Sequence, residues 1–393
     1  MLFRSLLAQW PLRPGERFSQ AAWSDAKSAV VARLRAAGYA TAAWAGTGAE
    51  VDLARTGVRL FIVADSGPLF RAGDIEIEGL VHHEAAKVRA LAPFAEGEAL
   101  TEARLLDYQD RLQKTGLFEG VSVSLDPDPA QAASTRVRVQ LREAPRQAAT
   151  VAVGYSANTG PRVTLEHVQR RLLDQPLSLR NKLLWGRAEQ SWDGELSTHP
   201  DHSYRRWSLG VTLDHEIGST DTVLSQRLRL GRSTDGGGME RFGYLEAERA
   251  RECPESSDCV NLRALSVHLD HGLRRLDNAL LPTRGYTAQL ELGAGLATGD
   301  GYRRGPFGRV RGRLTGYWPL GASWYGEARL ELGQVVMDHD VQAPDSQRFR
   351  AGGDDSVRGY AYRSLAPTRA DGSLTGGRVL ATASVELARP VSA

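Results

Sequence analysis

The sequence predicts two small mixed α/β modules followed by an antiparallel transmembrane β-barrel. Three observations lead to this fold class. The first 145 or so residues combine helical periodicity with short strands. The same order of elements then occurs a second time within that region. From about residue 147, apolar and charged residues alternate over roughly 245 residues, in segments of about 10 separated by Gly, Pro and Asp.

Composition limits the classes of protein that the chain can be. A length of 393 residues with 41% hydrophobic residues requires at least two folded units and is too apolar for a disordered protein. The net charge of +2 gives no electrostatic reason to expect a nucleic-acid partner. The longest apolar runs, such as residues 29–32, break within a few positions, so we expect no transmembrane helix.

The first module is predicted from one amphipathic helix and the strand that follows it. Trp23, Ala26, Val30 and Leu34 are at helical spacing, and this pattern predicts a helix over residues 23–38 that Ser24 or Asp25 caps and Gly38 ends. Residues 58–63 then read as a buried strand. We assign residues 1–66 to this module, which lacks a leading strand.

The second module is predicted to be complete and to cover residues 67–145. Its expected elements are a strand over 73–79, helices over 83–91 and 101–115, and paired strands over 118–125 and 135–141. Thr101 is the expected cap of the longer helix. Residues 14–18 resemble 95–100, and residues 38–39 resemble 116–118, which indicates two copies of one module.

Residues 146–393 alternate in the way a half-buried β-strand does. Glu327, Arg329 and Glu331 interleave with Ala328, Leu330 and Leu332. Both a soluble sandwich and a membrane barrel have such alternation, with opposite faces toward water. The length favours the barrel, with about twelve strands, and Trp207, Trp318 and Trp324 at strand ends suit an interfacial girdle. The barrel interpretation predicts two sets of residues on opposite faces. The leucines that face lipid are Leu290, Leu292, Leu330 and Leu332. The charged residues that face the lumen are Glu291, Arg329 and Glu331.

A motif near the end of the chain resembles that of a known family. Residues 352–360 read GGDDSVRGY, which resembles the Val-Arg-Gly-(Tyr/Phe) signature of the outer-membrane POTRA/β-barrel assembly superfamily. Residues 66–68, 151–156 and 282–286 resemble most closely its TamA branch, the barrel subunit of the translocation and assembly module. The resemblance implies periplasmic POTRA modules and an outer-membrane barrel with about 12 of about 16 strands present. No signal peptide or aromatic-ended final strand is seen at residues 1–7 or 390–393, so we interpret the sequence as truncated at both ends, without the strands that form the family's lateral gate.

The resemblance also implies function. A TamA-like protein inserts or translocates autotransporter-type and other β-barrel clients, and its partners are a TamB-like periplasm-spanning protein, unfolded clients and outer-membrane lipid. Alternatives in the same class are a BamA-like factor and a two-partner secretion transporter, and an outer-membrane barrel enzyme is an alternative from another class. We expect that the protein is not an enzyme and needs no cofactor. The chain has no G-x-S-x-G nucleophile elbow, and its glycine-rich residues 293–301 precede no helix that could help to bind a phosphate.

In the family, the loop that carries the motif folds into the lumen and its arginine pairs with acidic residues of the barrel wall. The resemblance therefore implies that Arg358 forms a buried pair with Glu386, which follows Ser384-Val385 on the next strand. Gly353 and Gly359 would let the loop turn sharply. Val357 and Tyr360 complete the set of loop-anchoring residues.

Two other groups of residues are candidate sites. Cys253 and Cys259 are the only cysteines, and their C-x5-C spacing does not match a zinc site. They form either a disulfide, which we favour, in an outward-facing loop, or two idle thiols. His82, His83 and Glu84 are adjacent at the start of a helix and point in different directions, so we expect no metal site.

Overall fold

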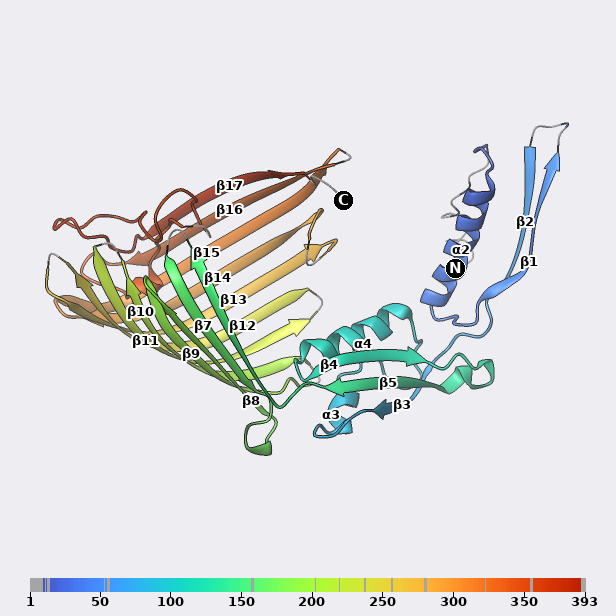
Figure 1. Ribbon diagram of the computed structural model, residues 1–393, viewed down its shortest axis with the longest axis horizontal. Coiled ribbons are helices and arrows are strands. Elements are labelled where there is room, and N and C mark those ends of the chain that lie inside the picture. Colours follow the sequence, from blue (N-terminus) through green and yellow to red (C-terminus); the bar gives the residue numbers. More distant parts are fainter. Residues whose placement is uncertain are drawn as a thin grey trace. The chain divides into compact units, whose positions relative to one another are not determined.

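The computed structural model describes residues 10, 12, 15–52, 54, 57–156, 159–201, 203–218, 220–236, 238–255, 257–278, 281–321, 323–353 and 356–389. The expectations for residues 1–7 and 390–393, and Asp354 and Asp355 of the motif, lie outside these ranges. The chain divides into two compact units, Met1–Ala144 and Pro145–Ala393 (Figure 1). Among the described residues, none of the helices is long and apolar enough to cross a membrane.

The first unit begins with a helix and a hairpin. The elements are α2 (Gln20–Ala36), β1 (Ala43–Asp52) and β2 (Gly57–Asp65), and the two strands are antiparallel. The four apolar residues of the predicted helix, Trp23, Ala26, Val30 and Leu34, are its buried face. The predicted start was wrong, because Ser19 is the cap and its side chain accepts a hydrogen bond from the Ala22 N–H at 3.1 Å.

The rest of the first unit has the element order predicted for the second module. The elements are β3 (Ala72–Glu78), α3 (Ala85–Ala90), α4 (Glu102–Lys114), β4 (Phe118–Leu125), the 3-10 turn η1 (Pro129–Ser134) and β5 (Thr135–Glu143). Strand β5 is central, with β3 parallel and β4 antiparallel to it. Alternate residues of β5, including Val137 and Val139, are buried, as are Tyr108 and Leu112 of α4. Thr101 caps α4, as predicted.

The second unit is one antiparallel sheet in which each strand pairs with its neighbours in sequence. Its twelve strands in the described residues confirm the predicted number. They are β6 (Gln147–Ser156), β7 (Gly160–Gln169), β8 (Leu177–Gly186), β9 (Glu189–Thr198), β10 (Arg205–Ile217), β11 (Asp221–Gly236), β12 (Met239–Pro254), β13 (Val260–Leu276), β14 (Gly285–Gly299), β15 (Tyr302–Leu320), β16 (Trp324–Met337) and β17 (Val379–Ala388). Short 3-10 turns occur at η2 (Leu172–Asp174) and η3 (Asp345–Gln347). The edge strands β6 and β17 do not pair with each other.

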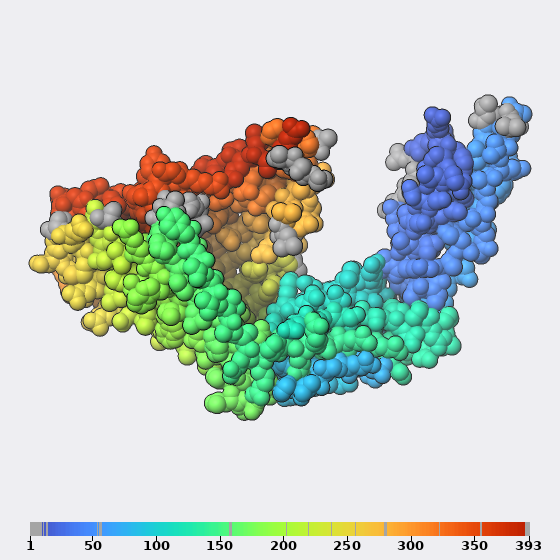
Figure 2. All heavy atoms as spheres, in the orientation of Figure 1, coloured from blue at the N-terminus to red at the C-terminus, as the bar shows by residue number. Residues whose placement is uncertain are grey.

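The two faces of this sheet differ as a barrel requires. The outer face carries the predicted leucines, and Leu330 and Leu332 are 46% and 52% exposed. Glu331, between them, points to the inner face and is 4% exposed. A sandwich would bury the leucines in a core, so the barrel interpretation is confirmed. Figure 2 shows the sheet bending around a hollow.

The connections between strands alternate between two ends of the sheet. The entry end is where the chain enters β6, and the far end is the opposite one. Residues 218–220, 255–259 and 338–378 connect strands at the far end. Trp207, Trp318 and Trp324 are exposed at the entry end, where aromatic residues are typical of a membrane interface.

Candidate functional site

The connection between β16 and β17, residues 338–378, is a folded element that we call the long loop. Its middle is among the most buried parts of the second unit, although loops are normally exposed. Val341, Asp345 and Arg348 are at most 5% exposed. Isolated β-bridges join Phe349 to Gly377 and Ala351 to Leu365. The long loop is therefore held in one conformation by its own backbone as well as by the sheet.

Asp345 is the centre of the contacts within the long loop. Its Oδ1 accepts hydrogen bonds from Arg350 Nε at 3.1 Å and from the Gly376 N–H at 3.0 Å, and Arg363 bonds Oδ2. Arg348 Nη2 is 3.7 Å away. Burial raises the pKa of Asp345, but Arg350, Arg363 and Arg348 lower it by more, so the pKa is below its ordinary value. The ionised carboxylate joins three arginines.

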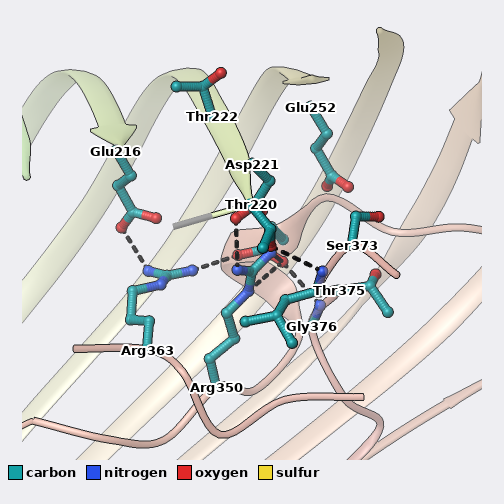
Figure 3. Close-up of polar contacts among 12 residues, drawn as sticks. Glu216, Thr220, Asp221, Thr222, Glu252, Arg350, Arg363, Ser373, Thr375 and Gly376 are labelled. Carbon is teal, nitrogen blue, oxygen red and sulfur yellow. Dashed lines mark hydrogen bonds and ion pairs between the residues drawn. The ribbon is translucent and has the colours of Figure 1, made fainter. Parts of the chain in front are cut away.

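Two of these arginines also bind β10 and β11, and Figure 3 shows both contacts. Arg350 donates to both oxygens of Asp221, at 3.2 and 2.6 Å, in a bidentate pair. Arg363 binds Glu216 through Nη1. Glu216 and Asp221 are at the far ends of β10 and β11, so the long loop is fixed to two neighbouring strands.

Strand β12 supplies three further acidic anchors on its inner face. Glu252 accepts from Arg348 at 2.8 and 2.9 Å and from Arg369 at 3.0 Å. Glu248 accepts from the Ser346 hydroxyl at 2.6 Å. Glu246 accepts from Gln347 Nε2 at 2.8 Å. All three carboxylates are at most 5% exposed, and removing their partners would leave buried charges uncompensated.

Eight charged residues at the centre of this interface balance one another, and we call this set the loop lock. Four carboxylates face four guanidinium groups within it. They are Glu216, Asp221, Glu252 and Asp345, and Arg348, Arg350, Arg363 and Arg369. A balanced, hydrogen-bonded set is the form in which buried charges are tolerated. The lock holds a loop in place, and its side chains do not form a nucleophile and base pair.

A second charged group lies beside the long loop on the inner face of β14 to β16. Arg311 bridges Glu291 at 3.0 Å and Glu331 at 2.6 Å, and Arg313 also binds Glu331. Arg309 binds Glu291 and lies over the Phe349 ring, with its Cζ 5.0 Å from the centroid. A cavity of 430 Å³ lies between this group and the long loop.

Comparison with known proteins identifies the family. The profile of the Omp85 superfamily domain matches residues 147–393, which contain the whole twelve-stranded sheet and the loop lock. The chain belongs to the Omp85 superfamily.

Solved structures similar to this Omp85 chain share its fold. BamA from Haemophilus ducreyi lacking POTRA domains 1-3 has 17% identity and a TM-score of 0.65, over 99% of this chain and 80% of that one. CdiB from Acinetobacter baumannii has 14% identity and a TM-score of 0.50, over 99% and 73%. CdiB from Escherichia coli has 15% and 0.50, over 91% and 68%. The predicted fold class, POTRA modules before an antiparallel barrel domain, is confirmed.

The structure places Arg358 next to Glu386, but not in a buried position. Arg358 Nη2 lies 3.2 Å from Glu386 Oε1, and the side chains are 67% and 39% exposed. The prediction of burial was wrong, because β17 pairs only with β16 among the described strands and solvent reaches Glu386 from its other side. Gly353 and Gly359 have φ values of +101° and +89°, as a sharp turn requires. Val357 is partly buried and Tyr360 is 52% exposed. Residues 358–360 of the motif therefore form an exposed part of the long loop, whereas Gly352 and Gly353 are buried.

The two cysteines are joined by a disulfide in the hairpin from β12 to β13, at the far end. Glu252, the anchor of Arg348 and Arg369, directly precedes Cys253. The bond therefore closes the hairpin that presents an acid of the loop lock.

The structure also places the His82 group and the glycine-rich residues 293–301. His82 Nδ1 lies 2.9 Å from the Glu143 carboxylate, within the first unit. The glycine-rich residues 293–301 lie mostly in β14. A Cβ at Gly293 would be 2.7 Å from the His268 ring, so this glycine allows a bulky inner-face residue of β13 to fit.

Sequence reasoning missed all eight residues of the loop lock. It selected Arg358 and overlooked Arg348, Arg350, Arg363 and Arg369, together with their acidic partners. One signal was available, because Glu246, Glu248 and Glu252 are at even spacing along one strand. Such a spacing puts three acids on the lumenal face and predicts basic partners for them.

Proposed function

We propose that the chain is a TamA-like outer-membrane factor that inserts or translocates autotransporter-type and other β-barrel clients. It would act from the outer membrane with its POTRA modules, partial at 1–66 and complete at 67–145, in the periplasm. The observation that carries this proposal is the loop lock inside the sheet of an Omp85 chain. A long, charge-anchored loop stabilises the wall from within, where a barrel lacks a packed apolar core.

The mechanism we propose is non-catalytic. The edge strand β6 has no second partner among the described strands, and Val151, Val153 and Tyr155 on it are at least 67% exposed. An unpaired edge offers backbone N–H and C=O groups to a client strand, which can then pair by β-augmentation. The loop lock would keep β10, β11 and β12 rigid while the client pairs with β6.

Two partners follow from this proposal. Unfolded outer-membrane proteins are the clients, and a TamB-like periplasm-spanning protein would deliver them to the POTRA modules. The exposed strand β2, with Phe61 and Val63 at 51% and 60% exposure, offers a second sheet edge for such a partner. Arg358, Glu386 and the flanking residues Gly353, Val357, Gly359 and Tyr360 are proposed to position the exposed part of the long loop.

Surface delivery of an autotransporter tests the proposed function. Cells that lack their own TamA-like protein would express the full-length protein, or the Asp345→Asn variant, together with one autotransporter. We expect wild type to restore the passenger on the cell surface and the variant to restore much less. Normal delivery without any TamA-like protein, or equal delivery by both forms at equal protein levels, would contradict the proposal. A client set limited to BamA-dependent barrels would instead indicate a BamA-like factor.

A further inference from the structure

The outer face of the sheet carries a group of arginines at the far end. Arg249 and Arg251 are on β12 and Arg263 is on β13, and all three side chains are exposed. Their neighbours in sequence, Glu248, Ala250, Glu252 and Leu262, point inward and are buried, so the arginines point away from the lumen. We call these three residues the outer arginine patch.

The register between β12 and β13 places two of these cations directly opposite each other. Arg249 pairs with Arg263, and opposed Cβ atoms in antiparallel strands are about 4.5–5.5 Å apart. Arg251 lies two residues further along the same face, about 7 Å away. Like charges in directly opposed positions destabilise a sheet. The folded chain alone therefore gains nothing from this arrangement.

Carboxylates on the described part of the chain form no direct ion pair with the patch. None lies within 4.0 Å of its three arginines, and the residues level with Arg249 and Arg263 on the neighbouring strands, Gln226 and Thr298, are uncharged. The turn residue Asp300 acts electrostatically on Arg263. Its carboxylate, however, already accepts hydrogen bonds from the backbone and side-chain nitrogens of Asn261, at 3.2 and 2.8 Å. A cluster of cations with little internal compensation fits an anionic ligand.

The strand register also places the patch at the edge of the apolar band. Four residues form a polar row across β11 to β14, namely Gln226, Arg249, Arg263 and Thr298. The next row toward the entry end is entirely apolar and consists of Leu228, Ala247, Leu265 and Leu296. Leu228, Leu265 and Leu296 are 42–62% exposed. A cationic row next to a lipid-facing row, on its far-end side, is at the level of lipid headgroups.

We propose that the outer arginine patch binds the phosphate groups of a phosphorylated lipid in the outer leaflet. The guanidinium groups would each donate planar pairs of hydrogen bonds to phosphate oxygens. The acyl chains would lie on the leucines of the next row. This lipid contact goes beyond protein assembly, and it needs only that the far end face the cell exterior, opposite the periplasmic POTRA modules.

The test compares lipids with and without phosphate. The full chain in an uncharged detergent is titrated with diphosphorylated lipid A, with dephosphorylated lipid A and with inorganic phosphate, and binding is followed by calorimetry. The variant is R249Q/R263Q. The control is R241Q, which removes an exposed arginine from the same face of β12 at its entry end.

We expect the phosphorylated lipid to bind wild type and R241Q with the same affinity. It should bind R249Q/R263Q at least roughly tenfold more weakly, since each arginine near a lipid surface contributes appreciably to the binding free energy. In lipid-free detergent the double variant should melt at or above the wild-type temperature, because the opposed charges are gone. Equal binding by the double variant would overturn the proposal. Equal binding of the dephosphorylated lipid would show that the contact is apolar alone. Comparable affinity for inorganic phosphate would show a free-phosphate site. Either result would overturn the proposal.

Discussion

Arg348 Nη2 donates hydrogen bonds to both oxygens of the Glu252 carboxylate, at 2.8 and 2.9 Å. The two side chains are 1% and 3% exposed, although 96 residues separate them in the sequence. Glu252 also binds Arg369, and Arg348 reaches Asp345 within the long loop. This pair therefore connects the wall of the sheet to the centre of the loop lock.

The first prediction concerns this pair. Arg348→Ala leaves the Glu252 charge buried with one partner fewer, and breaking a buried pair typically costs about 3–5 kcal/mol. We expect the long loop to become sensitive to protease between residues 338 and 378 while the strands stay intact. Limited proteolysis followed by mass spectrometry measures this.

The matched control is Arg358→Ala, because Arg358 also pairs with a carboxylate of the sheet but is 67% exposed. An exposed pair contributes about 0–1 kcal/mol, so the loop should stay protected in this variant. Equal cleavage of both variants, or of neither, would contradict the assignment of Arg348 as an anchor.

The second prediction concerns Arg358 and Glu386 in the full-length protein. If the pair positions the exposed motif, Arg358→Ala and Glu386→Ala should each reduce client assembly, and the double variant should be little worse than either. Arg358→Lys should rescue poorly, because lysine lacks the planar donor fork. Assembly assays on the four proteins complete the cycle. Strictly additive losses would show that the two residues act separately.

The third prediction concerns the disulfide between Cys253 and Cys259. Unreduced protein should resist thiol alkylation, and reduced protein should take up two equivalents. Because the bond closes a short loop, its removal should cost at most about 3 kcal/mol. Cys253→Ser/Cys259→Ser should also loosen the neighbouring Glu252 anchor and increase cleavage of the long loop. Full alkylation without reductant would be inconsistent with a bridge in the mature protein.

The fourth prediction is a pH dependence in the first unit. Glu143 Oε1 accepts hydrogen bonds from the backbone N–H groups of Val81, His82 and His83, at 2.9–3.0 Å. Burial raises the pKa of Glu143, but these bonds and the His82 side chain lower it by more, to about 2. An unfolded glutamate has a pKa of about 4.3. The stabilisation is therefore present above that pH and is lost as the pH falls toward 2.

Hydrogen exchange of the amides at residues 81–83 measures this effect. Protection relative to intrinsic exchange should decrease between about pH 5 and 2, the range that the two pKa values define. In Glu143→Gln, which cannot ionise, protection should be low and nearly constant over that range. The same decrease in both proteins would assign the pH dependence to another group.

The regular elements could be predicted from the sequence because their signals are local. The helix face of Trp23 and Leu34 and the alternation around Leu330 follow from periodicity alone. Strand β1 was missed, because its alanines and glycines have little strand preference and most of its residues are exposed. The cap at Ser19 was missed because Ser24 and Asp25 are equally good capping residues.

The loop lock could not be predicted from local signals. Arg350 and Asp221 are 129 residues apart, and Arg363 and Glu216 are 147 apart. Such pairs depend on which strands the long loop reaches, and only tertiary structure decides that. Family resemblance directed attention to Arg358, because its motif is recognisable in sequence, whereas the buried arginines have no motif.

The most direct test of the account is client insertion by the full-length protein in lipid vesicles. A β-barrel client is added unfolded, and its insertion is followed by heat-modifiable mobility, with wild type and with Asp345→Asn. The substitution keeps the shape of the side chain but removes the charge that joins Arg348, Arg350 and Arg363. We predict that wild type accelerates insertion and that Asp345→Asn falls to the rate of vesicles without protein. If the variant inserts the client at the wild-type rate although its long loop is protease-sensitive, the claim that the loop lock is required for assembly is contradicted.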